Sequence, residues 1–152
     1  MKNNNTDLVS NRRARHDYEL LETFEAGLVL QGTEIKSLRN GGGSLAESYV
    51  RLIDEEFWLV GAHIAPYSFG NIHNHPERRD RKLLLHKREM AKLCKAIQEK
   101  GLTIIPLAIY LKKGYAKIKI AIARGKKLHD KRQTIKERDE KKHMDRMMKN
   151  HE

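Results

Sequence analysis

Residues 115–123 carry the pattern that most constrains the fold of this chain. Isoleucines alternate there with cationic or small residues, in the order Lys117, Ile118, Lys119, Ile120, Ala121 and Ile122. A period of two residues is that of a β-strand with one buried and one exposed face. Such a strand needs partners to pair with and a second layer over its apolar face. The pattern therefore predicts a fold built on a sheet.

The segment before this strand is apolar on both faces. Residues 103–111 are rich in β-branched and other apolar side chains, and they lie between Gly101 and the turn-like stretch Lys112-Lys113-Gly114. They predict a second strand. Pro106 has no N–H group for a ladder hydrogen bond, so we expect this strand to lie at a sheet edge or to contain a bulge.

Further short strands are predicted nearer the N-terminus. Residues 18–22 and 26–30 are two short apolar runs separated by Thr23-Phe24-Glu25. Residues 48–53 and 57–62 flank Asp54-Glu55-Glu56, a spacing typical of a β-hairpin.

Two helices are also predicted. One covers residues 32–38 and ends at Asn40-Gly41-Gly42-Gly43, because glycine adopts the conformations that stop a helix. The other has a core-facing stripe at i, i+3, i+4 and i+7, made by Met90, Leu93, Cys94 and Ile97. We expect Cys94 to be a small buried hydrophobic residue, not a nucleophile. Short strands with a few helices predict a mainly β fold, a small β-barrel with helices packed at its openings.

The charge of the chain divides into two parts. The 152 residues have a net charge of +11, of which residues 124–152 carry +5, from 11 Lys/Arg and 6 Asp/Glu. The same segment has few apolar residues, namely Leu128, Ile135, Met144, Met147 and Met148. We expect this tail to be disordered alone and to become helical on a partner, because its Lys, Arg, Glu and Met favour helices. The alternative is a basic tail that only aids solubility.

Composition also bounds the compartment and the partner. No apolar run reaches the roughly 18 residues of a membrane span, the first residues lack the apolar core of a secretory signal, and one cysteine cannot form an internal disulfide. We expect a cytoplasmic protein with an anionic partner. Charge alone leaves DNA, RNA, a membrane surface and an acidic protein open.

No constellation of residues points to catalysis. His73 and His75, with His63, Glu77 and Asp80 nearby, allow a metal site, but histidines in such a basic loop also suit nucleic-acid contacts or solvent. The glycine run at 41–43 is not followed by the Gly-Lys-Ser/Thr of a phosphate-binding loop. We therefore predict no enzyme, no catalytic residue, no cofactor and no metal.

Basic residues form groups that suit an RNA partner. They occur at 11–16, in the short helix at 36 and 39, at 78–82, and on one strand face at 117 and 119. Guanidinium and ammonium groups contact phosphates, and guanidinium also stacks on exposed bases. Each group alone could be an ordinary solvated face.

Six stretches, in one order, resemble the family of small protein B (SmpB), bacterial proteins that bind transfer-messenger RNA (tmRNA). They are Asn11-Arg12-Arg13-Ala14-Arg15-His16, Phe24-Glu25-Ala26-Gly27-Leu28, Gly32-Thr33-Glu34-Ile35-Lys36-Ser37-Leu38-Arg39, Ser48-Tyr49-Val50, Arg81-Lys82-Leu83-Leu84-Leu85 and Gly125-Lys126-Lys127-Leu128-His129-Asp130-Lys131-Arg132. The resemblance covers the chain from Asn11 to its C-terminus. Gly41-Gly42-Gly43 and Glu47 depart from the family's usual residues, and both lie in one turn.

The resemblance implies a barrel related to the oligonucleotide-binding (OB) fold, and with it a division of the chain. Residues 1–15 would be a flexible basic segment, 16–123 the RNA-binding body, and 124–152 the ribosome-binding tail. The body would bind the tRNA-like domain of tmRNA and deliver it to stalled ribosomes for trans-translation. The tail would become helical in the empty mRNA channel near the decoding centre. Elongation factor Tu and alanyl-tRNA synthetase are candidate further partners, reached through the RNA.

The resemblance also implies site residues. Glu25, Leu84 and Lys117 match body positions that the family uses for RNA binding, and we add four cations from the same motifs, Lys36, Arg39, Arg81 and Lys82. In the tail, the decoding-site motif is matched by Gly125, Lys126, Lys127, Asp130, Lys131 and Arg132. His129 would stack on ribosomal RNA, and Met147 and Met148 match a late hydrophobic pair.

Two other functions remain open at this stage. One is a general single-strand-binding barrel with a basic tail, which would be indifferent to tRNA-like structure. The other is a metal-dependent nuclease that uses His73, His75 and nearby carboxylates.

Overall fold

The computed structural model describes residues 7–67 and 74–126. Along the chain, the elements are β1 (Asp7–Ser10), α1 (Ala14–Asp17), β2 (Tyr18–Leu28), α2 (Gly32–Arg39), β3 (Gly43–Ser44), β4 (Tyr49–Ile53), β5 (Glu56–Val60), β6 (His63–Ile64), β7 (Arg81–Leu84), α3 (Lys87–Ile97), β8 (Leu102–Lys112) and β9 (Tyr115–Gly125). The predicted mainly β fold is confirmed. None of the helices in the described ranges has the length and apolar character needed to cross a membrane.

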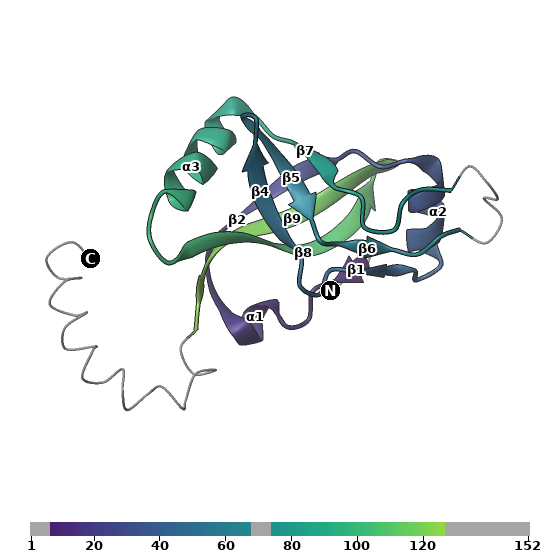
Figure 1. Cartoon of the computed structure of the whole chain (residues 1–152), viewed down its shortest axis with the longest axis horizontal. Helices are drawn as coiled ribbons and strands as arrows, with labels where there is room; N and C mark the ends of the chain where they lie inside the picture. The colour runs from purple at the N-terminus through teal and green to yellow at the C-terminus, as the bar shows by residue number, and fades with distance from the viewer. Residues whose placement is uncertain (1–6, 68–73, 127–152) are drawn as a thin grey trace, which may run out of the picture.

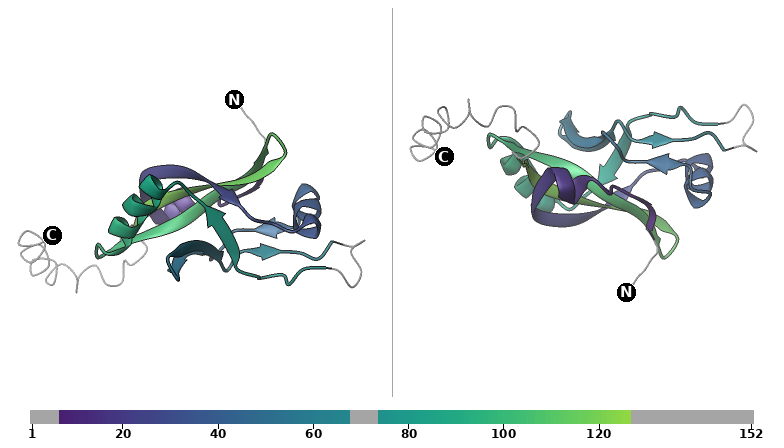
Figure 2. Two further views of the ribbon diagram at one scale, coloured as in Figure 1. Left: turned by 90° about the horizontal axis from the view of Figure 1, so that it is seen from above. Right: turned by 90° about the horizontal axis from the view of Figure 1, so that it is seen from below.

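The strands form one strongly curled antiparallel sheet. In the described residues its order is β1-β8-β9-β2-β7-β5-β4, and β3 pairs separately with β6. Helices α3 and α2 lie at opposite ends of the sheet (Figures 1 and 2). The three long strands β8, β9 and β2 form one layer, and the shorter β4, β5 and β7 fold over it.

The predicted barrel is not closed. β4 lies near β8, but β1 and β4 are the two edges of the sheet and no ladder joins them. β1 pairs with residues 108–110 of β8 and so occupies that part of the edge where a closing strand would pair. The architecture is therefore a curled, partly open sheet.

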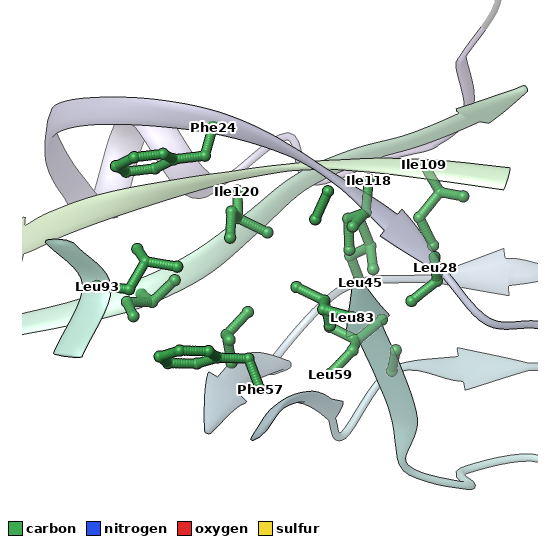
Figure 3. Close-up of a cluster of buried hydrophobic side chains, with 14 of the residues drawn as sticks. Phe24, Leu28, Leu45, Phe57, Leu59, Leu83, Leu93, Ile109, Ile118 and Ile120 are labelled. Atoms are coloured by element: carbon green, nitrogen blue, oxygen red, sulfur yellow. The ribbon is translucent and has the colours of Figure 1, made fainter. Parts of the chain in front are cut away.

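The core lies between the two layers of this curl. Phe24, Ile118 and Ile120 come from one layer, and Phe57 and Leu59 from the other, all less than a tenth exposed. Figure 3 shows these side chains pointing toward one another. Ile118 and Ile120 are fully buried, which confirms the inward face predicted for residues 115–123.

The outward face of the same strand is only partly solvated. Lys119 is exposed, but Ala121 and Ala123 are fully buried in a second cluster with Ile105, Leu107 and Ala14 of α1. α1 covers this end of the outer face. The alternation of residues 115–123 therefore describes one face correctly and misses a small second apolar layer.

The predicted turns and helix ends are mostly confirmed. Asp54 and Glu55 connect β4 to β5 with positive φ angles of 51° and 66°, as in the tight turns of hairpins. α2 begins where the Gln31 N–H donates to Glu34 Oε1 at 2.8 Å, and it is followed by Gly41 at a φ of 80°. In α3, Leu93 is fully buried, as predicted, but Ile97 is exposed because the buried stripe runs through Ala96 instead.

Two further expectations are corrected. Residues 18–28 form a single strand, β2, with an irregular register between Leu20 and Glu22, where two strands were predicted. Residues 7–15 include β1 and the buried Ala14, where a flexible segment was predicted. The expectation for Pro106 is confirmed, because β1 pairs with β8 only at residues 108–110, which leaves Pro106 on an unpaired part of that edge, and a bulge lies between Pro106 and Ala108.

Candidate nucleic-acid interface

One row of residues crosses the outer face of four strands. Tyr110 of β8 pairs with Lys117 of β9, Lys117 with Gly27 of β2, and Gly27 with Leu84 of β7. Residues paired directly across strands point to the same face of a sheet. Glu25 lies two residues before Gly27 and therefore shares this face. The structure thus brings Glu25, Leu84 and Lys117 together from three separate motifs.

Gly27 makes room for Leu84 at the centre of this row. A Cβ atom at position 27 would lie 3.2 Å from Leu84 Cβ and 3.4 Å from its Cδ1, which is close for atoms that are not bonded. The Leu84 side chain therefore covers the glycine, and Leu84 remains 53% exposed. An exposed leucine beside a lysine offers both apolar surface to an unstacked base and a cation to a phosphate.

Glu25 is held by groups that reach it across the sheet. The Tyr110 hydroxyl donates a short hydrogen bond to Glu25 Oε2, and Lys112 Nζ lies 3.4 Å from Oε1. The hydrogen bond from Tyr110, with the charges of Lys112 and Lys117, outweighs the effect of burial and lowers the pKa of Glu25. Burial and the neighbouring carboxylate raise the pKa of Tyr110. At neutral pH Glu25 is therefore an ionised group that only accepts hydrogen bonds.

A groove of about 700 Å³ lies beside Glu25. One wall is the outer face of β2, β9 and β8 and includes Lys119. The other wall runs from β1 into α1 and includes Arg12 and Arg15. The groove was not predicted, because it depends on residues 7–15 folding back onto β8. Tyr110 was also missed, since one tyrosine in an apolar strand gives no signal of its contact with Glu25.

Two of the four added cations are accessible. Lys36 and Arg39 are exposed on α2, and Lys36 Nζ lies 5.6 Å from the ring centre of Tyr67, within cation–π range. Lys82 is partly buried, and its Nζ forms an ion pair with Glu56 Oε2 at 3.0 Å.

Arg81 does not fit the predicted role in RNA binding. Its side chain is fully buried, with Nε 2.8 Å from Glu34 Oε2 and Nη1 3.0 Å from the Ala62 carbonyl oxygen. The motif contains several cations, and charge alone could not show which one points inward. Arg81 joins α2 to β7 and cannot contact a ligand without leaving the core.

The tail residues are described only at their start. Gly125 ends β9, and Lys126 is bound to the body, since its N–H donates to the Asp17 carbonyl oxygen at 3.0 Å and its Nζ to that of Arg15 at 2.8 Å. The other predicted tail residues, Lys127, His129, Asp130, Lys131, Arg132, Met147 and Met148, lie outside the described residues.

The histidine segment offers little to a metal ion. His75 is buried, and its ring nitrogens lie 2.9 Å from Thr33 Oγ1 and 3.0 Å from the Ile64 carbonyl oxygen. His63 Nε2 lies 2.9 Å from Glu77 Oε1. In residues 7–67 and 74–126, no three His, Cys, Asp or Glu residues are grouped as metal ligands, and His73 lies outside these ranges. The structure gives no support to the nuclease alternative, because both ring nitrogens of His75 are already hydrogen-bonded within the fold and one of these bonds would have to break to bind a metal.

The curled, partly open antiparallel sheet defines a small, mainly β protein related to the OB-fold, with exposed cations along the groove on its outer face. The family model described as "SmpB protein" matches residues 8–150. The chain belongs to the SmpB family.

Relatives with similar sequences match almost the whole chain. An SsrA-binding protein of Protochlamydia amoebophila is 63% identical over 149 residues, which cover 98% of this chain and 97% of the relative. One of Chlamydia muridarum is 56% identical, covering 94% and 95%. A solved structure described as "tmRNA-SmpB: a journey to the center of the bacterial ribosome" contains a similar chain, with a TM-score of 0.68 and 49% identity, covering 83% of this chain and 92% of that one.

Proposed function

We propose that this protein binds the tRNA-like domain of tmRNA and delivers it to stalled ribosomes for trans-translation. It acts as an adaptor in the cytoplasm and has no catalytic centre of its own. The observation that supports this most directly is the meeting of Glu25, Leu84 and Lys117 around Gly27, on one accessible face of the sheet. The SmpB family membership and the relatives named SsrA-binding protein support the choice of RNA.

The chemistry of this face suits a single-stranded loop of a folded RNA. Leu84 packs against an unstacked base, Lys117 contacts a phosphate, and the Glu25 carboxylate accepts hydrogen bonds from a base edge. Lys36 and Arg39 on α2 provide further cations for the RNA backbone. Lys82 contributes less, because it is already paired with Glu56.

The tail performs a separate step on the ribosome. Residues 127–152 enter the empty mRNA channel and form a helix, with His129 stacked on ribosomal RNA near the decoding centre and Met147 and Met148 needed for accommodation. The start of the tail is held on the body, because Gly125 pairs with Tyr18 of β2 and Lys126 donates to two carbonyl oxygens of α1. Elongation factor Tu and alanyl-tRNA synthetase meet the complex through the RNA.

RNA binding is tested with two RNAs of equal length. The protein should bind the tRNA-like domain much more tightly than an unstructured RNA, and the affinity should fall steeply with salt because counterions are released. Equal affinity for the two RNAs would favour a general single-strand-binding protein and contradict the proposal.

The division between body and tail is tested by deletion of residues 127–152. This variant keeps β9 and both hydrogen bonds of Lys126, so it should bind tmRNA nearly as well as the full chain. It should lose peptide tagging on ribosomes stalled at the end of a message. A variant that loses both activities equally would refute the separation of roles.

A further inference from the structure

We propose that the groove beside Glu25 binds one unstacked guanine nucleotide of the RNA, and that the Glu25 carboxylate selects guanine over the other bases. This inference rests on the proposed function, because it assigns a base preference to the same RNA-binding face.

The groove has the size and position for a single nucleotide. Its volume of about 700 Å³ falls within the roughly 300–1,000 Å³ of small-molecule sites. Glu25 lies in the wall formed by the sheet, close to the row of Lys117, Gly27 and Leu84. A loop that crosses this row can therefore place one base on Leu84 and the adjacent nucleotide in the groove.

The selectivity follows from the chemistry of a carboxylate. An ionised carboxylate has two oxygens that accept hydrogen bonds and no donor. The Watson–Crick edge of guanine presents two adjacent donors, N1–H and the N2 amino group. Adenine, cytosine and uracil each place an acceptor next to every donor on this edge. Guanine is thus the base that can satisfy both oxygens of Glu25 without setting an acceptor against one of them.

Glu25 is prepared for this contact and remains open to it. Its side chain is 37% exposed, so a base can reach it. Tyr110 donates to Oε2 and Lys112 lies near Oε1, which leaves each oxygen a further acceptor site. These partners orient the carboxylate, and they lower the pKa of Glu25, so that it carries its charge at neutral pH.

The groove also holds cations for the phosphate of the same nucleotide. Lys119 lies opposite Glu25 in the strand register, and Arg12 and Arg15 line the opposite wall of the groove. All three are exposed, and in the part of the chain that the structure describes none of them forms an ion pair. Unpaired guanidinium and ammonium groups bind phosphate oxygens strongly. Asp7 is the other carboxylate of the groove, and it serves as the matched comparison for Glu25.

The test replaces each single-stranded guanine of the tRNA-like domain, one at a time, by inosine, which lacks the N2 amino group. Affinities are measured for the wild-type protein, Glu25→Gln, Asp7→Asn and Lys119→Ala. The wild type should lose about tenfold in affinity at one position. Glu25→Gln should bind the guanine and inosine RNAs at this position equally, because an amide offers one acceptor and one donor. Lys119→Ala should weaken all RNAs alike and lower the salt slope by about 1, with the inosine effect unchanged.

Different failures have different meanings. If the wild type binds the tRNA-like domain tightly but no inosine position matters, the guanine preference is wrong and the proposed function stands. If the inosine effect survives in Glu25→Gln, or disappears in Asp7→Asn, Glu25 is not the selecting residue. If the wild type does not prefer the tRNA-like domain at all, the proposed function fails, and the inference fails with it. Glu25, Asp7 and Lys119 are all exposed, so their substitution should leave the free energy of unfolding unchanged. This is measured for each variant before RNA binding is compared.

Discussion

Glu34 in α2 and Glu25 in β2 are both surrounded by donors, but in different environments. Glu34 is fully buried, with Arg81 Nε 2.8 Å from Oε2 and Arg79 Nη2 2.6 Å from Oε1. Glu25 is exposed and contacts Tyr110 and Lys112 at the edge of an open groove. In the first cluster the charges satisfy one another within the fold. In the second they leave acceptor sites and unpaired cations at the surface, where a ligand can use them.

The buried cluster joins separate parts of the chain. Glu34 also accepts from the Gln31 N–H, and Arg81 donates to the carbonyl oxygens of Ala62 and Glu77. Arg81 therefore ties α2 to β7 and to both ends of the segment between residues 62 and 77. Removal of one partner leaves a buried charge without compensation, which costs far more than the loss of an exposed pair.

The strongest test of this contrast compares Glu34→Ala with Glu25→Ala. Loss of Glu34 should reduce the free energy of unfolding by about 3–5 kcal/mol, because Arg81 stays buried without its carboxylate. Loss of Glu25 should change it by less than about 1 kcal/mol. Urea unfolding followed by circular dichroism gives both values. Equal destabilisation in the two variants would show that burial of Glu34 does not make its cluster more important for stability than the exposed cluster around Glu25.

The pH dependence of stability gives a second, smaller effect. Burial acts to raise the pKa of Glu34, but hydrogen bonds from Arg79, the Gln31 N–H and Arg81 outweigh it and lower the pKa below the ordinary 4.5. The stabilisation by ionised Glu34 is therefore complete above pH 4.5 and is lost as the pH falls through the folded-state pKa. Glu34→Gln should be about 2 kcal/mol less stable than the wild type at pH 7, and the gap should narrow at pH 3.5.

The matched control for this experiment is Glu56→Gln. Glu56 forms an ion pair with Lys82, but its side chain is 45% exposed. Its substitution should change stability little at either pH. A gap between wild type and Glu34→Gln that stays constant as the pH falls would contradict the assigned pKa shift.

The same contrast marks how far the sequence could predict the site. Periodicity predicted Ile118 and Ile120 as core residues, because burial of one face leaves a direct signature in the sequence. The resemblance implied Glu25, Leu84 and Lys117, and the strand register brings them together. Arg81 was assigned to the surface by its charge and is in the core. A buried ion pair depends on where Glu34, distant in the sequence, is placed by the fold, and no local pattern carries that information.

The fold was predictable to a similar extent. Turn residues correctly predicted the hairpin at Asp54 and Glu55 and the end of α2 before Gly41. A barrel was predicted, but the sheet is open, because β1 pairs with β8 along part of the edge. A strand of four residues with no clear alternation, Asp7–Ser10, gives too little signal to be found from the sequence. Its position also creates one wall of the groove.

Substitutions on the exposed face should affect RNA binding and leave stability unchanged. Leu84→Ala removes an apolar surface that is 53% exposed in the free protein, and the affinity for the tRNA-like domain should fall about tenfold. The free energy of unfolding should change by less than about 1 kcal/mol. Ile97→Ala, on α3, is the control, because Ile97 is also an exposed apolar residue but lies on a different element. A comparable loss of affinity in the control would mean that the effect does not come from the row around Gly27.

Tyr110→Phe should have the smallest effect and is specific to the exposed cluster. It removes the hydroxyl that donates to Glu25, which should weaken RNA binding about threefold at pH 7, the usual size of one net hydrogen bond. The pKa of Glu25 should then rise toward the ordinary 4.5, because the group that lowers it most is gone. Binding that needs an ionised carboxylate should fail at a higher pH in Tyr110→Phe than in the wild type as the solution is acidified. In the Glu25→Gln background the tyrosine substitution should no longer shift this pH profile. A shift that persists there would mean that Tyr110 acts on the RNA directly and does not orient Glu25.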